Sequence, residues 1–187
     1  MKPAEQENQE SAKSGSPAAL APNLRATMLA AQDALLAKGE ELERRIGDLY
    51  AACAGRFPEE QTFWLDLMKE EKEHVVLIQA LRNALRHSGQ LLDFNQSVRE
   101  GLHTLDALMT ATRKKLDAKR LTPVEMLRAA LALEAALLDQ SFFNLLKAKN
   151  PIFRSIARKL SVDTQHHYNQ ITATLRAHLA SKPPPKL

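Results

Sequence analysis

Residues 64–78 read WLDLMKEEKEHVVLI, and their spacing predicts an amphipathic helix that carries two ionisable side chains on its apolar face. A helix turns about 100° per residue, so residues three, four or seven apart share a face. Glu71 lies at the centre of the apolar stripe and His74 one turn further on, while Glu70 and Glu73 point toward water. The stripe consists of Trp64, Leu67, Met68, Val75, Ile78 and Leu85. This stretch therefore predicts a Glu-x-x-His pair directed into a helical core.

Two other segments also place a glutamate in the middle of an apolar stripe. Glu43 shares its helical face with Leu36, Ile46, Gly47, Tyr50, Ala54 and Phe57. Glu134 shares its face with Leu127, Ala130, Leu131, Leu137, Leu138, Ser141 and Leu145. Three carboxylates from three helices are thus predicted to point inward.

The whole chain reads as a set of helices in one domain. Its 187 residues include only 6 glycines, and aromatic residues make up 5%, which argues against a β-sandwich or barrel. Caps, prolines and glycines divide the chain into five predicted helices, at about residues 24–57, 58–87, 95–119, 123–149 and 152–180. We expect an all-α, ferritin-like four-helix bundle over residues 24–180, with the third helix in the long connection between the two halves.

The two ends of the chain differ from this pattern. Residues 1–23 are polar, contain three prolines and show no sustained periodicity, so they are expected to form a flexible tail. Residues 181–187 are rich in proline, which is expected to end the last helix and leave a short extended tail.

Cysteine content and hydropathy favour a cytoplasmic protein. The lone Cys53 excludes an internal disulfide, a CxxC pair and a four-cysteine metal site. The sequence contains neither an apolar leader segment nor a run of about 18 apolar residues, so we expect no signal peptide and no membrane contact.

The net charge of +4 is a second guide to partners. Basic residues gather near the start of the last predicted helix, at Lys147, Lys149, Arg154, Arg158 and Lys159. A solvated helix face explains them better than nucleic-acid binding, because no aromatic or glycine-rich nucleic-acid motif accompanies them.

The inward acids point to a metal. A single core-edge glutamate usually finds an arginine or leans out to solvent. An unpaired buried carboxylate costs several kcal/mol, however, so three of them with a histidine on separate helices favour a bound cation. Carboxylate and imidazole ligands suit iron, manganese or zinc.

These residues resemble the ferritin-like superfamily, specifically its rubrerythrin-type branch. The likeness rests on Glu43 followed seven residues later by Tyr50, then on Glu71 and His74, then on Glu134, and it spans residues 24–180. In that family each half of the bundle supplies one glutamate and one Glu-x-x-His, and the set holds two irons.

The resemblance implies a role for each residue. Glu71 would bridge two iron ions, with manganese or a mixed pair as alternatives, Glu43 and Glu134 would bind one ion each, and His74 and His167 would cap opposite ends. Tyr50 would lie near the metals, where its phenol can hydrogen-bond a ligand carboxylate, although ordinary core packing also accounts for it.

The last predicted helix departs from the family pattern. Its apolar stripe includes His167 and leaves His166 at the surface, and the position three before His167 holds Thr164 in place of a glutamate. Asp163, four residues before His167, could supply the missing carboxylate and so restore the second metal position. A core histidine bonded to a neighbouring acid is the alternative for His167, and His178 is expected to be exposed.

Three further residues have simpler explanations. Glu40 lies about 60° from Glu43 and could add a carboxylate, but solvent exposure is favoured. Cys53 and Trp64 are expected to be ordinary core residues.

Two functions are compatible with these residues. The first is a metal-dependent oxidoreductase that reduces peroxide or dioxygen, or oxidises Fe(II), and that needs an external electron donor protein because the chain lacks a rubredoxin module. The second is a non-catalytic helical module with a vestigial metal site that engages an acidic partner. Bundles of this kind often dimerise, so a homodimer is compatible with either function.

Overall fold

The computed structural model describes residues 22–92, 96–139 and 150–181, and within these ranges it is all-helical, without a β-strand. The elements are α1 (Pro22–Arg56), a 3-10 turn η1 (Pro58–Glu60), α2 (Gln61–Ser88), α3 (Gln96–Asp117), α4 (Pro123–Asp139) and α5 (Pro151–Ser181). None of the described helices is long and apolar enough to span a lipid bilayer. The expectation of an all-α fold is confirmed.

Where both sides of a boundary are described, the predicted helix limits hold to within a few residues, and local chemistry explains them. Gly89 ends α2 in the left-handed conformation, with φ of 58°, and its N–H donates to the Leu85 carbonyl at 3.0 Å. Before α4, Thr122 and Glu125 form a capping box in which the Thr122 N–H donates to the Glu125 carboxylate at 2.8 Å. Pro22 and Asn23, expected in the tail, belong to the first turn of α1.

Some predictions lie outside the described residues. These are the two tails at residues 1–21 and 182–187, and the predicted continuation of the fourth helix through residues 140–149. Ser141, Leu145, Lys147 and Lys149 fall in that last stretch.

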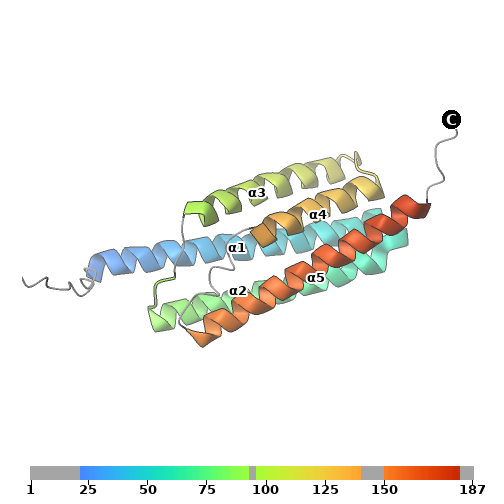
Figure 1. The fold of residues 1–187 in the computed structure, drawn as a ribbon. Coiled ribbons are helices and arrows are strands. Elements are labelled where there is room, and N and C mark those ends of the chain that lie inside the picture. Colours follow the sequence, from blue (N-terminus) through green and yellow to red (C-terminus); the bar gives the residue numbers. More distant parts are fainter. Residues whose placement is uncertain (1–21, 93–95, 140–149, 182–187) are drawn as a thin grey trace, which may run out of the picture.

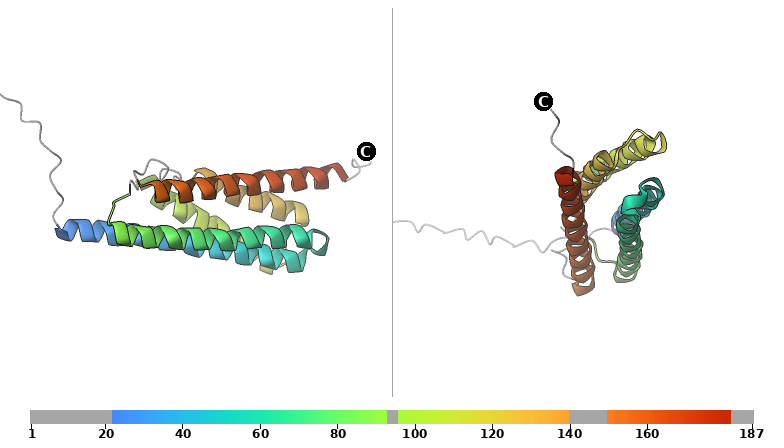
Figure 2. Two further views of the ribbon diagram at one scale, coloured as in Figure 1. Left: turned by 90° about the horizontal axis from the view of Figure 1, so that it is seen from below. Right: turned by 90° about the vertical axis from the view of Figure 1, so that its right-hand side faces the viewer.

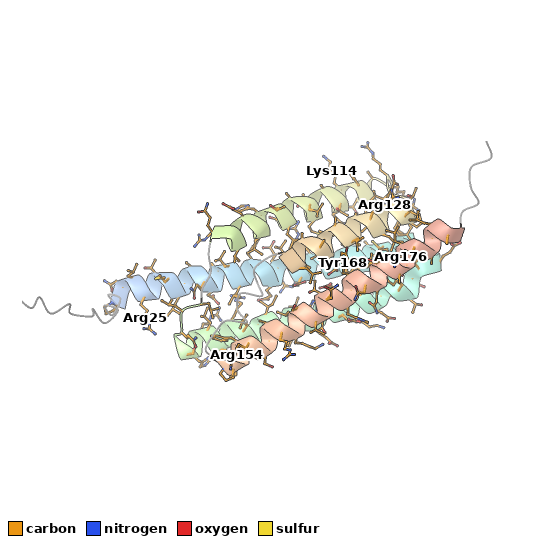
Figure 3. The ribbon with its side chains drawn as sticks, viewed as in Figure 1. Arg25, Lys114, Arg128, Arg154, Tyr168 and Arg176 are labelled. Atoms are coloured by element: carbon orange, nitrogen blue, oxygen red, sulfur yellow. The ribbon has the colours of Figure 1, made fainter. Side chains whose placement is uncertain are left out.

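The long helices lie roughly along one another (Figures 1 and 2). α2 runs antiparallel to α1 and lies against it, and α5 runs antiparallel to α2 on another side. α4 packs on α5, while α3 lies between α4 and α1. Exposed basic side chains stand on the outer faces, among them Lys114, Arg128, Arg154 and Arg176 (Figure 3).

Apolar residues form two separate cores along the length of the molecule. The larger core joins α1 and α2 to α3 and α4 and includes Ile171 of α5; α3 contributes Val98, Leu102, Leu105, Met109 and Leu116 to it. The smaller core joins α1, α2 and α5 through Leu36, Ile78, Leu81, Leu85, Leu92, Phe153, Ile156, Ala157 and Leu160. Along α1, α2 and α5 the chain crosses from one core to the other near residues 40, 74 and 164, and buried polar side chains occupy that junction.

Candidate metal centre

Five ionisable side chains from four helices meet at the junction of the two cores. This inner cluster consists of Glu43 on α1, Glu71 and His74 on α2, Glu134 on α4 and His167 on α5. Glu43 is 7% exposed, and the other four are at most 1% exposed. The structure therefore brings together three predicted carboxylates and both predicted histidines.

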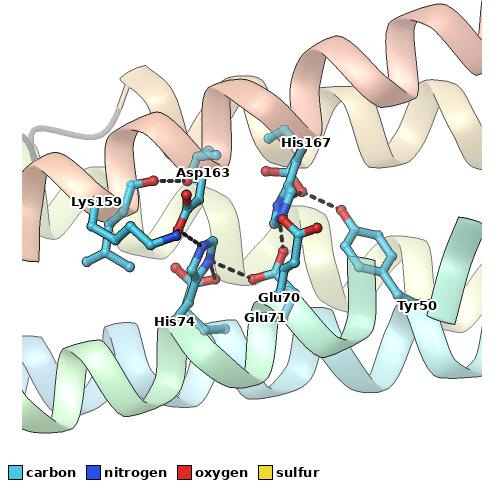
Figure 4. Close-up of polar contacts among 11 residues, drawn as sticks. Tyr50, Glu70, Glu71, His74, Lys159, Asp163 and His167 are labelled. Atoms are coloured by element: carbon cyan, nitrogen blue, oxygen red, sulfur yellow. Dashed lines mark hydrogen bonds and ion pairs between the residues drawn. The ribbon is translucent and has the colours of Figure 1, made fainter. Parts of the chain in front are cut away.

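Glu71 lies between the two histidine rings (Figure 4). Its Oε2 is 3.1 Å from His74 Nδ1, and its Oε1 is 3.2 Å from His167 Nδ1. The two rings stack with their centroids 5.3 Å apart. One ligand atom from each of these three residues lies within 4.8 Å of the other two, a separation that a single metal ion can bridge.

Glu43 and Glu134 flank this central group on opposite sides. Glu43 Oε2 is 3.9 Å from His74 Nδ1, and Glu134 Oε1 is 3.7 Å from His167 Nδ1. The Tyr50 hydroxyl donates a 2.6 Å hydrogen bond to Glu134 Oε1. Tyr50 thus touches a candidate ligand rather than only packing in the core.

A second pair of acids, Glu70 and Asp163, lies behind the histidine rings; we call them the outer acids. Glu70 Oε2 is 2.9 Å from His167 Nε2, and Asp163 Oδ2 is 3.5 Å from His74 Nε2. Each outer acid therefore faces the ring nitrogen opposite the one that faces Glu71. Asp163 also accepts a 2.5 Å hydrogen bond from the Lys159 ammonium group.

The expectation that Glu70 points toward water is correct only in part. Its side chain is 36% exposed and reaches across to α5. The missed signal is a repeated spacing, because Glu70 precedes His74 by four residues as Asp163 precedes His167. Since α2 and α5 are antiparallel, each acid reaches the histidine of the other helix.

This reciprocity gives the site an approximate internal twofold relation. Glu43, Glu70 and His74 in the first half correspond to Glu134, Asp163 and His167 in the second. The counterpart of Glu71 is Thr164, which is buried and donates its hydroxyl to the Leu160 carbonyl at 2.9 Å. Asp163 faces the outer nitrogen of His74, so its predicted role as a metal ligand stays a prediction.

Burial and mutual charge control protonation in the inner cluster. Burial, reinforced by the charge of Glu71, raises the pKa of Glu43 to about 8, and burial also raises the pKa of Glu134. Burial by itself would lower the histidine pKa values. Close contacts with the surrounding carboxylates outweigh burial and raise the pKa of His74 and of His167 to about 11.

Glu71 behaves differently from the other two carboxylates. Burial opposes its ionisation, but the contacts with the His167 and His74 rings outweigh burial and lower its pKa. Burial and the charge of Glu134 raise the pKa of Tyr50, which stays a neutral donor.

The hydrogen bonding of the inner cluster is incomplete, and its unsatisfied atoms show whether the residues suit a metal ion. One atom of each member makes no hydrogen bond with a described residue: Glu43 Oε2, Glu71 Oε1, Glu134 Oε2, His74 Nε2 and His167 Nδ1. Two of these, Glu71 Oε1 and His167 Nδ1, lie 3.2 Å apart as an ion pair, and His74 Nε2 lies 3.5 Å from Asp163 Oδ2. Buried polar atoms are normally satisfied, so such a concentration calls for an explanation. Carboxylate oxygens and imidazole nitrogens are suitable ligands for iron, manganese or zinc, so the residues fit the predicted cation.

Among the remaining residues singled out from the sequence, Glu40 was placed wrongly and His178 correctly only in part. Glu40 was expected in solvent, but it is 7% exposed and hydrogen-bonds Gln79 and Arg82 on α2, away from the inner cluster. His166 is exposed as expected, and His178 is partly exposed and contacts Glu60 at 2.7 Å. Cys53 and Trp64 are buried in the larger core, which confirms both.

Comparison with known proteins adds no further assignment. Neither a protein-family model, nor a curated protein, nor a solved structure matches this chain.

Proposed function

We propose that this chain is a ferritin-like, rubrerythrin-type protein that holds iron, or manganese, in its inner cluster. The four-helix bundle would consist of α1, α2, α4 and α5, with α3 as the additional helix. Glu43, Glu71, His74, Glu134 and His167 would hold the metal. The observation that supports this most strongly is the convergence of three buried carboxylates and two buried histidines from four helices in one layer between two apolar cores.

A bound iron or manganese ion would supply one-electron redox chemistry toward peroxide or dioxygen, or would allow Fe(II) to be oxidised. The chain's own residues supply the surroundings. Glu70 and Asp163 orient the histidine rings, the Tyr50 hydroxyl fixes one carboxylate, and the two cores exclude bulk water. Turnover with peroxide requires an external electron donor, because the lone cysteine offers no redox pair of its own.

Metal content tests this proposal directly. Purified protein incubated with Fe(II) or Mn(II) and then desalted should retain about two equivalents per chain, the number that a carboxylate-bridged bundle site holds. Glu71→Gln should remove most of the bound metal, because it replaces the central ligand oxygen with an amide. Glu73→Gln is the matched control, since Glu73 is an exposed glutamate on the same helix.

Two outcomes would count against this function. Metal content well below one equivalent, unchanged by Glu71→Gln, would favour the non-catalytic interaction module. Normal metal content with no ferric absorption after aerobic addition of Fe(II) would leave a metal-binding bundle without redox activity.

A further inference from the structure

A cavity of about 240 Å³ lies between α1 and α2 and reaches the inner cluster from outside. We call it the entry cavity; it is lined by Glu43, Arg44, Gly47, Asp48, Lys72 and Val75. Gly47 separates it from the central ligand, because a Cβ placed on Gly47 would lie only 3.3 Å from the Cβ of Glu71. The missing side chain at this position allows α1 and α2 to approach closely beside the site.

The entry cavity is distinguished from the neighbouring surface hollows by its contact with the cluster. A cavity of about 380 Å³ between α2 and α5 is lined by Lys72, Glu73, Val76, Leu77 and Lys159. Another, of about 160 Å³, is lined by Leu35, Lys38, Arg99, Leu102 and His103. Neither of these two is lined by a member of the inner cluster, whereas Glu43 forms part of the wall of the entry cavity.

Exposure within the cluster points to the same side. The Glu43 side chain is 9% exposed, while those of Glu71, Glu134 and His167 are 0% exposed and that of His74 is 1% exposed. Glu43 Oε2 nevertheless lacks a hydrogen-bond partner among the described residues. Glu43 is thus the cluster member that lines the cavity, while its buried Oε2 lies 3.9 Å from His74 Nδ1.

The charges along the cavity favour a cation. Asp48 is exposed at the mouth, Glu43 is nearly buried, and Glu71 is fully buried, so carboxylates continue from solvent to the central ligand. The exposed Arg44 is already paired with Glu40 at 2.7 Å. Lys72 forms no ion pair with a described residue and is the positive group that a cation must pass.

We propose that the entry cavity is the route by which a divalent metal ion reaches the inner cluster, with Asp48 as the recruiting group and Glu43 as the carboxylate that receives the ion. This inference rests on the proposed function, because it requires that the cluster bind a metal. It goes further by assigning a transit site to residues of α1 and α2.

Narrowing the cavity tests the route, with Co²⁺ as the probe. Stopped-flow absorbance of the Co²⁺ bands gives the association rate, and mixing with excess chelator gives the release rate. Val75→Phe should slow both by about tenfold, equivalent to about 1.4 kcal/mol of added barrier, and should leave the equilibrium Kd unchanged. Val76→Phe is the matched control, because Val76 is the next residue but lines the other cavity.

Charge changes at the mouth provide a second test that does not endanger folding. Asp48→Asn should slow Co²⁺ association by about two- to threefold at low ionic strength, and Lys72→Glu should accelerate it by a similar factor. Both effects should vanish at about 1 M salt, where the Debye length is about 3 Å. Lys115→Glu, at an exposed position on α3, reverses a charge away from the cavity and should leave the rate unchanged.

The results separate the two proposals. The entry route alone would be overturned if Co²⁺ binds tightly at equilibrium but Val75→Phe leaves the association and release rates unchanged. It would also be overturned if Val76→Phe slows these rates as much as Val75→Phe does. A wild-type chain that binds no Co²⁺ at equilibrium would overturn the proposed function and the route together.

Discussion

At the scale of single residues, the candidate centre includes two acids that lie on the far side of the histidine rings from Glu71. Glu70 and Asp163 each approach the outer nitrogen of a histidine whose inner nitrogen faces Glu71. An acid in this position fixes the ring's orientation and tautomer and makes the inner nitrogen a better ligand. The pairing crosses between α2 and α5, so it also ties the two helices together at the level of the site.

We therefore predict that Glu70→Gln and Asp163→Asn each weaken metal binding by about 10- to 100-fold without abolishing it. Isothermal titration with Mn²⁺ or Co²⁺ measures the effect. Asp66→Asn is the control, because Asp66 is exposed on α2 and pairs only with Lys69 among the described residues. Unchanged affinity in both variants would show that the outer acids serve packing alone.

Tyr50 offers a prediction that needs no metal. Its hydroxyl is buried and donates to Glu134 at 2.6 Å, so Tyr50→Phe leaves a buried carboxylate oxygen with one partner fewer. Chemical denaturation of the metal-free protein should show a loss of about 1–3 kcal/mol in the free energy of unfolding. Tyr168→Phe should cost less, since Tyr168 is only partly buried and its hydroxyl makes no hydrogen bond with a described residue. Equal costs would contradict a special role for the Tyr50 hydroxyl.

At the scale of elements, α1 and α2 are joined by a polar network beside the smaller core. Arg82 on α2 hydrogen-bonds Asp33 at 3.1 Å and Glu40 at 2.5 Å, both on α1. The hydrogen bond from Arg82 lowers the pKa of Asp33. For Glu40, burial raises the pKa, but hydrogen bonds from Gln79, Arg82 and Arg44 outweigh it and lower the pKa overall. The network holds the register of the helix pair that positions Glu43 opposite Glu71.

We predict that Arg82→Met lowers the free energy of unfolding at neutral pH by about 1.5–3 kcal/mol, the range for hydrogen bonds to charged groups. Because both carboxyl groups have pKa values below the ordinary 3.8 and 4.5, their contribution is present above those values and is lost as the pH falls below them. Denaturation curves of wild type and Arg82→Met should therefore differ at pH 7 and converge as the pH is lowered. Arg113→Met is the control and should lower the free energy of unfolding by well under 1 kcal/mol, because its Asp117 partner is exposed. A difference in stability between wild type and Arg82→Met that persisted in acid would contradict the assignment.

At the scale of the whole molecule, the inner cluster interrupts an otherwise apolar interior. The two cores are separated by a layer whose charges compensate one another only in part, so a bound cation should stabilise the whole bundle. Without metal, bound protons supply the positive charge in this layer, because His74 and His167 have pKa values of about 11 and Glu43 has a pKa of about 8.

Metal binding should therefore release protons. At pH 7, titration with Mn²⁺ in buffers of different ionisation enthalpy should reveal release of about two protons or more per chain, from the two histidines and Glu43. The raised histidine pKa values stabilise the metal-free fold below about pH 6.5, and this contribution is lost as the pH rises toward about 11. Metal affinity follows the opposite trend, so the rise in Tm caused by metal should grow from pH 6 to pH 8. A heat of binding independent of the buffer would contradict this picture.

Much of this could be predicted from sequence, because helical periodicity is a local property. The spacing around Glu71 and His74 fixed their inward phase, and the same argument located Glu43, Glu134 and His167. Phase within one helix does not reveal what another helix brings near, so Glu70 and Glu40 were both assigned to solvent. Each reaches a partner on a neighbouring helix, His167 in one case and Arg82 in the other.

The amino-acid order by itself thus determined the described helices and most of the side chains that face inward, because backbone geometry and hydrophobic burial act over a few residues. Only the tertiary structure decided that α2 and α5 run antiparallel in a register that exchanges Glu70 and Asp163 between the two histidines. It also decided that Asp163 stands behind His74 and that a cavity opens beside Gly47. Helix register and spacing depend on packing between segments far apart in the chain, which no local pattern encodes.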